Sequence, residues 1–349
     1  MMKPKPTLSL LALLVHLLLS GCGGPPKPAE TPLPGEVNPP TTPQEDLARG
    51  MRAMQQGNYE SAIEAYQRAI QKDERNVEAW LHLGEAYELS GNPEEAVAQY
   101  KKVLELDPTH LEAYHALGRL YERFENYGAA AMVYGRALEQ YPEKRELYYK
   151  TATAMLEAGS LHGAESVSRE ALERDPDDAR ALLLLGKALL AQGKLDGARN
   201  AFEAVVARDP LQTEAYTLLG VVFMRMGKIE DAQVNLAKAL DLNPDLAAAH
   251  YNLALAIRGQ RHRLPEALQH LEKAVALEPD DPDIREELAR TYFEMGMYDE
   301  AANEMKRVIH DDPENPERYL FLAKIYEQMN EVGASIQALS KATQLLGRD

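Results

Sequence analysis

Prolines recur along this chain at a fixed spacing, and this spacing constrains the fold more than any other feature of the sequence. Five prolines lie 34 residues apart, and two more continue the series after one step of 35 residues. The series is Pro108, Pro142, Pro176, Pro210, Pro244, Pro279 and Pro313. A period of this length is typical of a solenoid, in which each unit buries its apolar face against its neighbours.

Each unit contains two apolar patterns with helical spacing. Counting from Val77, the fourth, seventh, eighth and eleventh residues are Trp80, Leu83, Gly84 and Tyr87, and other units repeat this pattern. Such spacing places side chains on one face of an α-helix. In the second half of each unit an alanine recurs at a fixed position, from Ala62 to Ala301. Glycines mark the predicted turn between the two helices, at Gly57, Gly91, Gly159, Gly193, Gly227 and Gly296.

These positions resemble the motif of the tetratricopeptide repeat, in which W-L-G-Y, A-F-A and a terminal P are spaced in this way. The resemblance covers residues 43–349 as one array. Its units start near Pro43, Val77, Leu111, Arg145, Ala179, Thr213, Ala247, Pro282 and Pro316. The resemblance implies an all-α fold, a right-handed superhelical solenoid of about nine helix–turn–helix repeats that holds a protein or peptide partner.

The two terminal units depart from the pattern. The first has Asp46, Arg49 and Ala53 where bulky apolar residues are usual, so we expect its outer surface to be polar. It opens with Thr42-Pro43-Gln44-Glu45, a capping box with proline at the first helical position. The last unit has Ser335 in place of the usual alanine. Atypical ends predict capping repeats. The seventh unit has one extra residue near Arg261–Arg263, which predicts a longer, basic turn.

The first 42 residues read as a targeting signal followed by a tether. Lys3 and Lys5 precede an apolar run, and the run ends in Leu19-Ser20-Gly21-Cys22. Residues 1–21 have the layout of a secretory signal peptide, although a short buried helix would show a similar run. The last four residues resemble the lipobox of bacterial lipoproteins, which implies that Cys22 carries a covalent lipid after cleavage.

Residues 22–42 form the predicted tether. They are rich in proline and lack a periodic apolar face, so they would reach roughly 65 Å when fully extended. An unstructured tail without a role has the same composition. Gly23 after the cysteine favours an outer-membrane anchor facing the periplasm, with the inner membrane or surface exposure left open.

Composition excludes several classes of partner and site. The formal net charge is −17, which argues against nucleic-acid binding and against docking on anionic lipid. The single cysteine excludes an intrachain disulfide framework and a cysteine-cluster metal site. His110 and His115 straddle a repeat boundary, which disfavours a shared metal. The acidic segment 278–283 could suggest a calcium loop, but similar boundary acids predict helix-end turns instead.

No motif of an enzyme is present, so the sequence predicts a non-enzymatic protein without a cofactor or a small-molecule substrate. The remaining candidate site is a stripe beside the buried face of each first helix, formed by its second, fifth, ninth and twelfth residues. The resemblance to the tetratricopeptide repeat implies that this stripe faces the inside of the superhelix and holds peptides. This stripe is acidic in the second unit and more apolar in units four to seven, which is typical of a partner groove flanked by charge. The alternative is that these side chains are half-buried core residues between repeats. The candidate groove residues are Tyr149, Leu183, Lys187, Val221, Met224, Tyr251, Asn252 and Leu255.

The combined features predict a lipid-anchored scaffold that faces the periplasm and takes part in assembly of the cell envelope. The resemblance extends to pilotin-type lipoproteins of Gram-negative bacteria, and type IV pilus or secretin biogenesis is the leading candidate. A periplasmic holdase chaperone is one alternative, and an accessory subunit of a peptidoglycan or polysaccharide enzyme is another. The partner itself, the envelope machine and the oligomeric state are not encoded in any motif.

Overall fold

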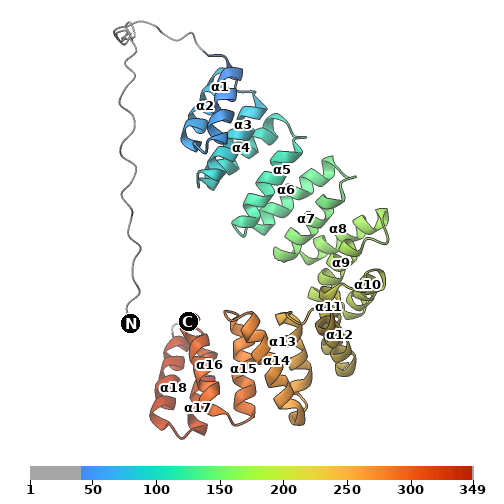
Figure 1. Cartoon of the computed structure of the whole chain (residues 1–349), viewed down its shortest axis with the longest axis vertical. Coiled ribbons are helices and arrows are strands. Elements are labelled where there is room, and N and C mark those ends of the chain that lie inside the picture. The colour runs from blue at the N-terminus through green and yellow to red at the C-terminus, as the bar shows by residue number, and fades with distance from the viewer. Residues whose placement is uncertain (1–40, 348–349) are drawn as a thin grey trace, which may run out of the picture.

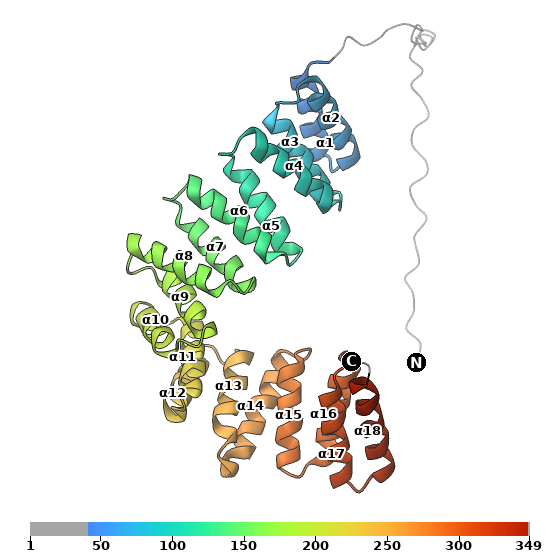
Figure 2. The same cartoon turned by 180° about the vertical axis from the view of Figure 1, so that it is seen from behind.

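The computed structural model describes residues 41–347, and within this range the protein is built from α-helices with one short 3₁₀ helix and no strand. Figures 1 and 2 show the helices in consecutive packed pairs that follow one another around an arc. The predicted signal peptide, Cys22 and all of the tether except Thr41 and Thr42 lie outside the described residues. No described helix has the length and apolar character needed to cross a membrane.

Every repeat consists of a first and a second helix. The first helices are α1 (Pro43–Gln55), α3 (Val77–Leu89), α5 (Leu111–Arg123), α7 (Arg145–Glu157), α9 (Ala179–Ala191), α11 (Thr213–Arg225), α13 (Ala247–Arg258), α15 (Pro282–Glu294) and α17 (Pro316–Gln328). The second helices are α2 (Tyr59–Lys72), α4 (Pro93–Leu106), α6 (Tyr127–Gln140), α8 (Leu161–Arg174), α10 (Leu195–Arg208), α12 (Ile229–Leu242), α14 (Leu264–Leu277), α16 (Tyr298–Asp311) and α18 (Val332–Leu346). This architecture confirms the predicted fold class, a right-handed tetratricopeptide repeat solenoid of about nine repeats.

The turn between the two helices of a repeat needs a left-handed backbone. All six glycines predicted at this turn have positive φ, from 71° at Gly57 to 83° at Gly91. Glu125 and Asn330 take the same position in repeats three and nine, with φ of 55° and 59°. In repeat seven the extra residue changes the connection, and the 3₁₀ helix η1 (Arg261–Arg263) replaces the left-handed turn.

The fourth residue of several first helices ties its helix to the preceding repeat boundary. The Tyr114 and Tyr148 hydroxyls donate hydrogen bonds to the carbonyls of Pro108 and Pro142, six residues earlier, at 3.0 and 3.1 Å. His250 occupies the equivalent position, and its Nε2 lies 2.9 Å from the Pro244 carbonyl. The half-buried His250 therefore makes the same contact with its repeat boundary as Tyr114 and Tyr148 do.

A second repeated contact fixes the two helices of one repeat against each other. The glycine at the eighth position faces the side chain sixteen residues later, which is Tyr134 for Gly118 and Phe202 for Gly186. Both rings are fully buried. A Cβ atom on Gly118 or Gly186 would lie only 2.3 or 2.4 Å from a ring carbon. The glycine is thus required for the close approach of the ring.

Alanine at Gly118 is expected to lower the free energy of unfolding by about 1–3 kcal/mol, because the added methyl group overlaps the buried Tyr134 ring. Gly128 in α6 is the matched control, since a Cβ there meets nothing within 4 Å. Gly128→Ala should raise stability by about 0.5–1 kcal/mol through better helix propensity. Urea denaturation of both variants measures the difference, and equal effects would contradict the packing argument.

The N-terminal end of the array differs from the predicted polar surface at one residue. Asp46 is completely buried, because Thr41 and two side chains of α2 cover it. Its carboxylate accepts hydrogen bonds from Thr41 Oγ1 at 2.8 Å, Lys72 Nζ at 2.5 Å and Arg68 Nε at 3.4 Å. The prediction for Asp46 was therefore wrong, whereas Arg49 is exposed as expected. The predicted capping box at Thr42 and Glu45 is confirmed, with both of its hydrogen bonds present.

Candidate functional site

The first helices line the inner side of the arc. Neighbouring first helices contact one another at the α7–α9 and α11–α13 junctions in the centre of the array. Figures 1 and 2 both place α9 toward the hollow of the arc and its partner α10 toward the outside. The inner face is therefore built mainly from first helices, as the resemblance implies.

The apolar candidates of repeats five and six belong largely to the core between repeats. Leu183 is only 8% exposed and packs in a buried cluster with Phe202 and Leu219. Val221 and Met224 are half-buried and pack against the same cluster. These three residues therefore present little apolar surface to a partner, and the alternative of a core role describes Leu183 better.

Tyr149 takes part in a polar network between α7 and α9. Its hydroxyl donates a hydrogen bond to Asp178, which itself caps the first turn of α9. The Arg180 guanidinium lies over the Tyr149 ring at 4.4 Å and pairs with Glu146 at 3.0 Å. Burial, followed by the hydrogen bond to the Asp178 carboxylate, raises the pKa of Tyr149 to about 12. The hydroxyl thus remains protonated, and the network presents a cation and a carboxylate on the inner face.

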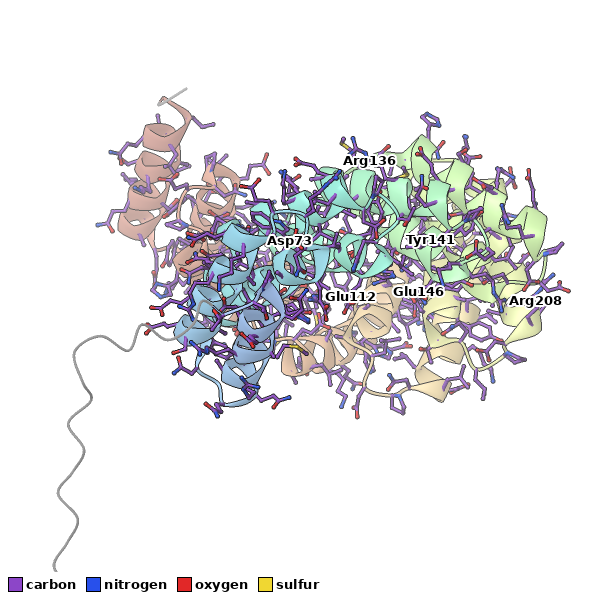
Figure 3. The ribbon with its side chains drawn as sticks, turned by 90° about the horizontal axis from the view of Figure 1, so that it is seen from above. Asp73, Glu112, Arg136, Tyr141, Glu146 and Arg208 are labelled. Carbon is purple, nitrogen blue, oxygen red and sulfur yellow. The ribbon has the colours of Figure 1, made fainter. Side chains whose placement is uncertain are left out.

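The other polar candidates also have partners within the array. Lys187 Nζ lies 2.5 Å from Glu214 Oε1, and Asn252 Nδ2 donates to the Ala248 carbonyl at 2.7 Å. Both side chains are thus paired within the array, and neither is brought together with another candidate to form a carboxylate clamp. Figure 3 shows Glu112 and Glu146, the second residues of α5 and α7, following one another in successive first helices, with Arg136 of α6 lying away from them.

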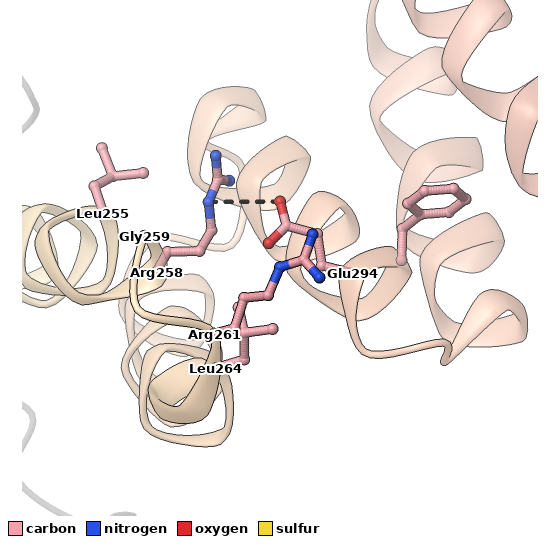
Figure 4. A pocket seen from close by; sticks show the side chains of 7 residues that line it. Leu255, Arg258, Gly259, Arg261, Leu264 and Glu294 are labelled. Atoms are coloured by element: carbon pink, nitrogen blue, oxygen red, sulfur yellow. Dashed lines mark ion pairs between the residues drawn. The ribbon is translucent and has the colours of Figure 1, made fainter.

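Repeats seven and eight enclose a pocket of about 670 Å³ between the end of α13, the helix η1 and the end of α15. Leu255, Leu264 and Phe293 form its apolar part (Figure 4). Arg258, Arg261 and Glu294 add charge at the rim. Of the predicted groove residues, Leu255 is the one that lines this pocket, and the half-buried Tyr251 lies one turn earlier on α13.

The two arginines of this pocket differ in their partners. Arg258 pairs with Glu287 and approaches Glu294 at 3.9 Å. Within residues 41–347, the exposed side chain of Arg261 makes no ion pair or hydrogen bond. Arg261 is therefore available to bind an acidic group of a partner. Phe293 was missed in the sequence, although it occupies the twelfth position of its helix and reading that position in repeat eight would have found it.

The N-terminal part of the inner face is acidic. A pocket of about 650 Å³ there is lined by apolar residues such as Met54 and Leu89 and by Glu85, Glu88 and Glu112. Glu88 accepts a hydrogen bond from Arg119 at 3.3 Å, and Glu85 lies 2.7 Å from His82 Nδ1. The hydrogen bond with Glu85 raises the pKa of His82 despite partial burial. The acidic side chains of the predicted stripe therefore line a pocket at this end of the array, whereas its central apolar residues pack largely in the core.

Helix-end chemistry accounts for the acidic segment 278–283. The Asp281 carboxylate accepts hydrogen bonds from the backbone N–H groups of Asp283 and Ile284 at 2.8 and 3.1 Å, so it caps α15. His110 caps α5 in the same way, accepting from the Ala113 N–H at 3.3 Å. No group of three or more histidine, cysteine, aspartate or glutamate residues suited to a metal occurs among the described residues.

Comparison with known proteins identifies the repeats. Residues 167–349, slightly more than half of the chain, match the family described as Cilia and flagella-associated protein 70 C-terminal domain. Residues 47–110 and 88–150 match two families described as tetratricopeptide repeat. A curated relative is the human Protein O-mannosyl-transferase TMTC1, 31% identical over 112 residues. The match covers 32% of this chain and 12% of that protein, so the two share only a segment.

Two solved structures share the fold. A tetratricopeptide repeat protein from Parabacteroides merdae has a TM-score of 0.52 and 20% identity, and the match covers 71% of this chain and 98% of that one. The APC/C hetero-tetramer Cut9-Hcn1 has a TM-score of 0.56 and 15% identity, over 90% of this chain and 77% of that one. The chain belongs to the family described as Cilia and flagella-associated protein 70 C-terminal domain, a tetratricopeptide repeat family, and its fold is one that generally serves as a protein-interaction scaffold.

Proposed function

We propose that this protein is a lipid-anchored scaffold of the bacterial cell envelope that binds a segment of another envelope protein on its inner face. The lipid on Cys22 would hold the chain at a membrane, with the outer membrane and a periplasm-facing array as the leading case. The proline-rich tether would keep the repeats away from the bilayer. Assembly of a type IV pilus or secretin is the leading role, without an enzymatic activity of its own.

The observation that carries this proposal is the pocket between α13, η1 and α15. It combines the apolar side chains of Leu255, Leu264 and Phe293 with the exposed Arg261, which has no ion pair within residues 41–347. Concave sites of this kind can hold a peptide through apolar contacts and a few polar groups that fix its orientation. A peptide segment with one bulky apolar side chain beside an acidic group fits this arrangement.

The binding site is tested by placing a photo-crosslinking amino acid at Leu255 in living cells. Leu211 is the control position, because it is 73% exposed at the boundary between repeats five and six and does not line this pocket. Cross-links to one protein from Leu255, and none from Leu211, are the expected result. Arg261→Glu should reduce this capture about tenfold, which corresponds to about 1.4 kcal/mol. Arg52→Glu, an exposed charge reversal on α1, should leave it unchanged.

Equal capture by the Arg261→Glu variant would rule out this pocket as the binding site. A holdase would instead cross-link to many unrelated proteins and suppress their aggregation. An accessory subunit would be recognised by loss of activity in a captured hydrolase or transferase when the repeat protein is removed.

The anchor has a separate test. Cys22→Ala should move the protein from the membrane fraction to the soluble fraction once the signal peptide is removed, because the acyl chains supply the membrane affinity. Fractionation of cells that express each form measures this change. A variant that stays with the membranes after its signal peptide has been cleaved would show that Cys22 is not the anchor.

A further inference from the structure

The last helix of the array has an apolar stripe that no described residue covers. Val332, Ile336, Leu339 and Leu346 of α18 are 66%, 60%, 44% and 56% exposed. Their separations of four, three and seven residues place them on one side of the helix. Within residues 41–347 the stripe is therefore an unpartnered apolar face.

The equivalent positions of the preceding repeat show what such a face contacts. Ile336 and Leu339 lie 34 residues after Ala302 and Met305 of α16, which are 2% and 0% exposed. Ala302 and Met305 are buried in a cluster that includes Leu322 of α17, the first helix of the next repeat. The stripe on α18 is thus the surface on which a further helix would pack.

Among the second helices of the described repeats, α18 differs in charge, because each of the others contains at least one acidic residue. Between Val332 and Leu346 the only charged residue is Lys341, and no acidic residue occurs, although the chain as a whole has a net charge of −17. Lys341 lies five residues after Ile336, which places its side chain away from the stripe on the helix. Two copies that meet along α18 therefore bring together helices without acidic residues, which limits the repulsion between the acidic arrays.

The opposite end of the array does not fit this stripe. Arg49 of α1 occupies the position at which inner repeats bury Leu83, Leu117 and Leu219, and it is exposed. Stacking α18 of one copy on α1 of another would bury the Arg49 guanidinium, which is costly without a partner. Packing the α18 stripes of two copies against each other about a twofold axis does not bury Arg49, and the assembly is complete with two copies.

We infer that a second copy of this chain covers the stripe, with the α18 helices of the two copies packed against each other in a symmetric dimer. This inference is independent of the proposed function and of the anchor. It gives the C-terminal repeat a defined partner, and it leaves the pocket between α13 and α15 outside the interface.

Sedimentation of the full chain in mild detergent tests the dimer. The wild-type protein should be dimeric at micromolar concentration. The double variant Ile336→Glu/Leu346→Glu introduces two carboxylates from each copy into the interface. The dissociation constant of the dimer should then rise at least about 100-fold. Val234→Glu on α12, a site 69% exposed in the monomer, is the matched control and should stay dimeric. Circular dichroism of each variant should retain the helical signal, because all three sites are exposed.

Cross-linking gives a second measurement that does not depend on weakening the interface. In a Cys22→Ala background, Thr343→Cys places the only thiol within the stripe, whereas Thr153→Cys places it on α7. A bismaleimide linker should join two Thr343→Cys chains and leave Thr153→Cys chains single. A monomeric wild-type protein, a double glutamate variant that dimerises as the wild type does, or a protein of another sequence bound at the stripe would each overturn the inference.

Discussion

Replacing Phe202 with alanine is expected to lower the free energy of unfolding by about 3–5 kcal/mol. The Phe202 ring is fully buried and fills the space over Gly186, within the cluster that joins repeats five and six. Helices cannot close this space without moving the neighbouring repeat, so most of the cavity should remain. Urea denaturation would measure the loss, and hydrogen exchange should locate it in α9 to α12.

The matched control is Phe124→Ala. Phe124 is 39% exposed at the end of α5, so the same truncation there should cost less than about 1 kcal/mol. Because each repeat contacts mainly its neighbours, the effect of Phe202→Ala should be strongest in the centre of the array. A similar loss for both variants, or exchange that rises uniformly along the chain, would show that the central cluster has no special role.

Replacing Lys72 with methionine is expected to destabilise the first repeat by about 3 kcal/mol at pH 7, because it removes the nearest cation from a fully buried carboxylate. Arg68 remains at 3.4 Å and Thr41 at 2.8 Å, so the site is weakened without losing every partner. Thermal unfolding and hydrogen exchange of α1 and α2 would measure the change. Lys102→Met removes an exposed pair with Glu105 at 3.0 Å and should cost less than about 0.5 kcal/mol.

The pH dependence of the stability difference between the wild-type protein and Lys72→Met distinguishes loss of the ion pair from loss of packing. Burial alone would raise the pKa of Asp46, but hydrogen bonds from Lys72, Thr41 and Arg68 hold it below its usual value of 3.8. The contribution of this carboxylate to stability is therefore present above pH 3.8 and is lost as the pH falls through the folded-state pKa. In Lys72→Met the pKa of Asp46 should rise. The two proteins should then converge in stability toward acid pH, and a constant difference would contradict the role of the ion pair.

Local, periodic features could be predicted from the sequence alone. The first helices begin at the residues where the repeat units begin, and the six turn glycines have the left-handed backbone that their position requires. Both features depend on contacts within about one repeat, where helical spacing and the conformational freedom of glycine are sufficient guides. The contact of His250 with the Pro244 carbonyl is local in the same way, since Tyr114 and Tyr148 make the equivalent contact in their own repeats.

Features that depend on contacts between elements could not be predicted. Asp46 looks exposed in the sequence, and its burial follows from Lys72, which lies 26 residues later. Leu183 and Leu320 occupy the same position in their repeats, yet they are 8% and 42% exposed, because among residues 41–347 a following repeat packs against Leu183 and none packs against Leu320. A count of helical positions therefore cannot separate the inner surface from the core. The pocket beside η1 likewise depends on where the extra residue of repeat seven directs the chain.

The contact between the glycine at the eighth position of a first helix and the ring sixteen residues later has a mechanical consequence. Where a ring such as Tyr100 or Tyr134 sits against its glycine, the two helices of that repeat cannot slide or roll past each other without steric overlap. Such a repeat behaves as a rigid unit, and deformation of the array is confined to small rotations between neighbouring repeats. Rotations of this kind add along the array, so a force applied between its two ends would change the pitch of the superhelix while each repeat stays folded. The array should then extend and recoil as an elastic element.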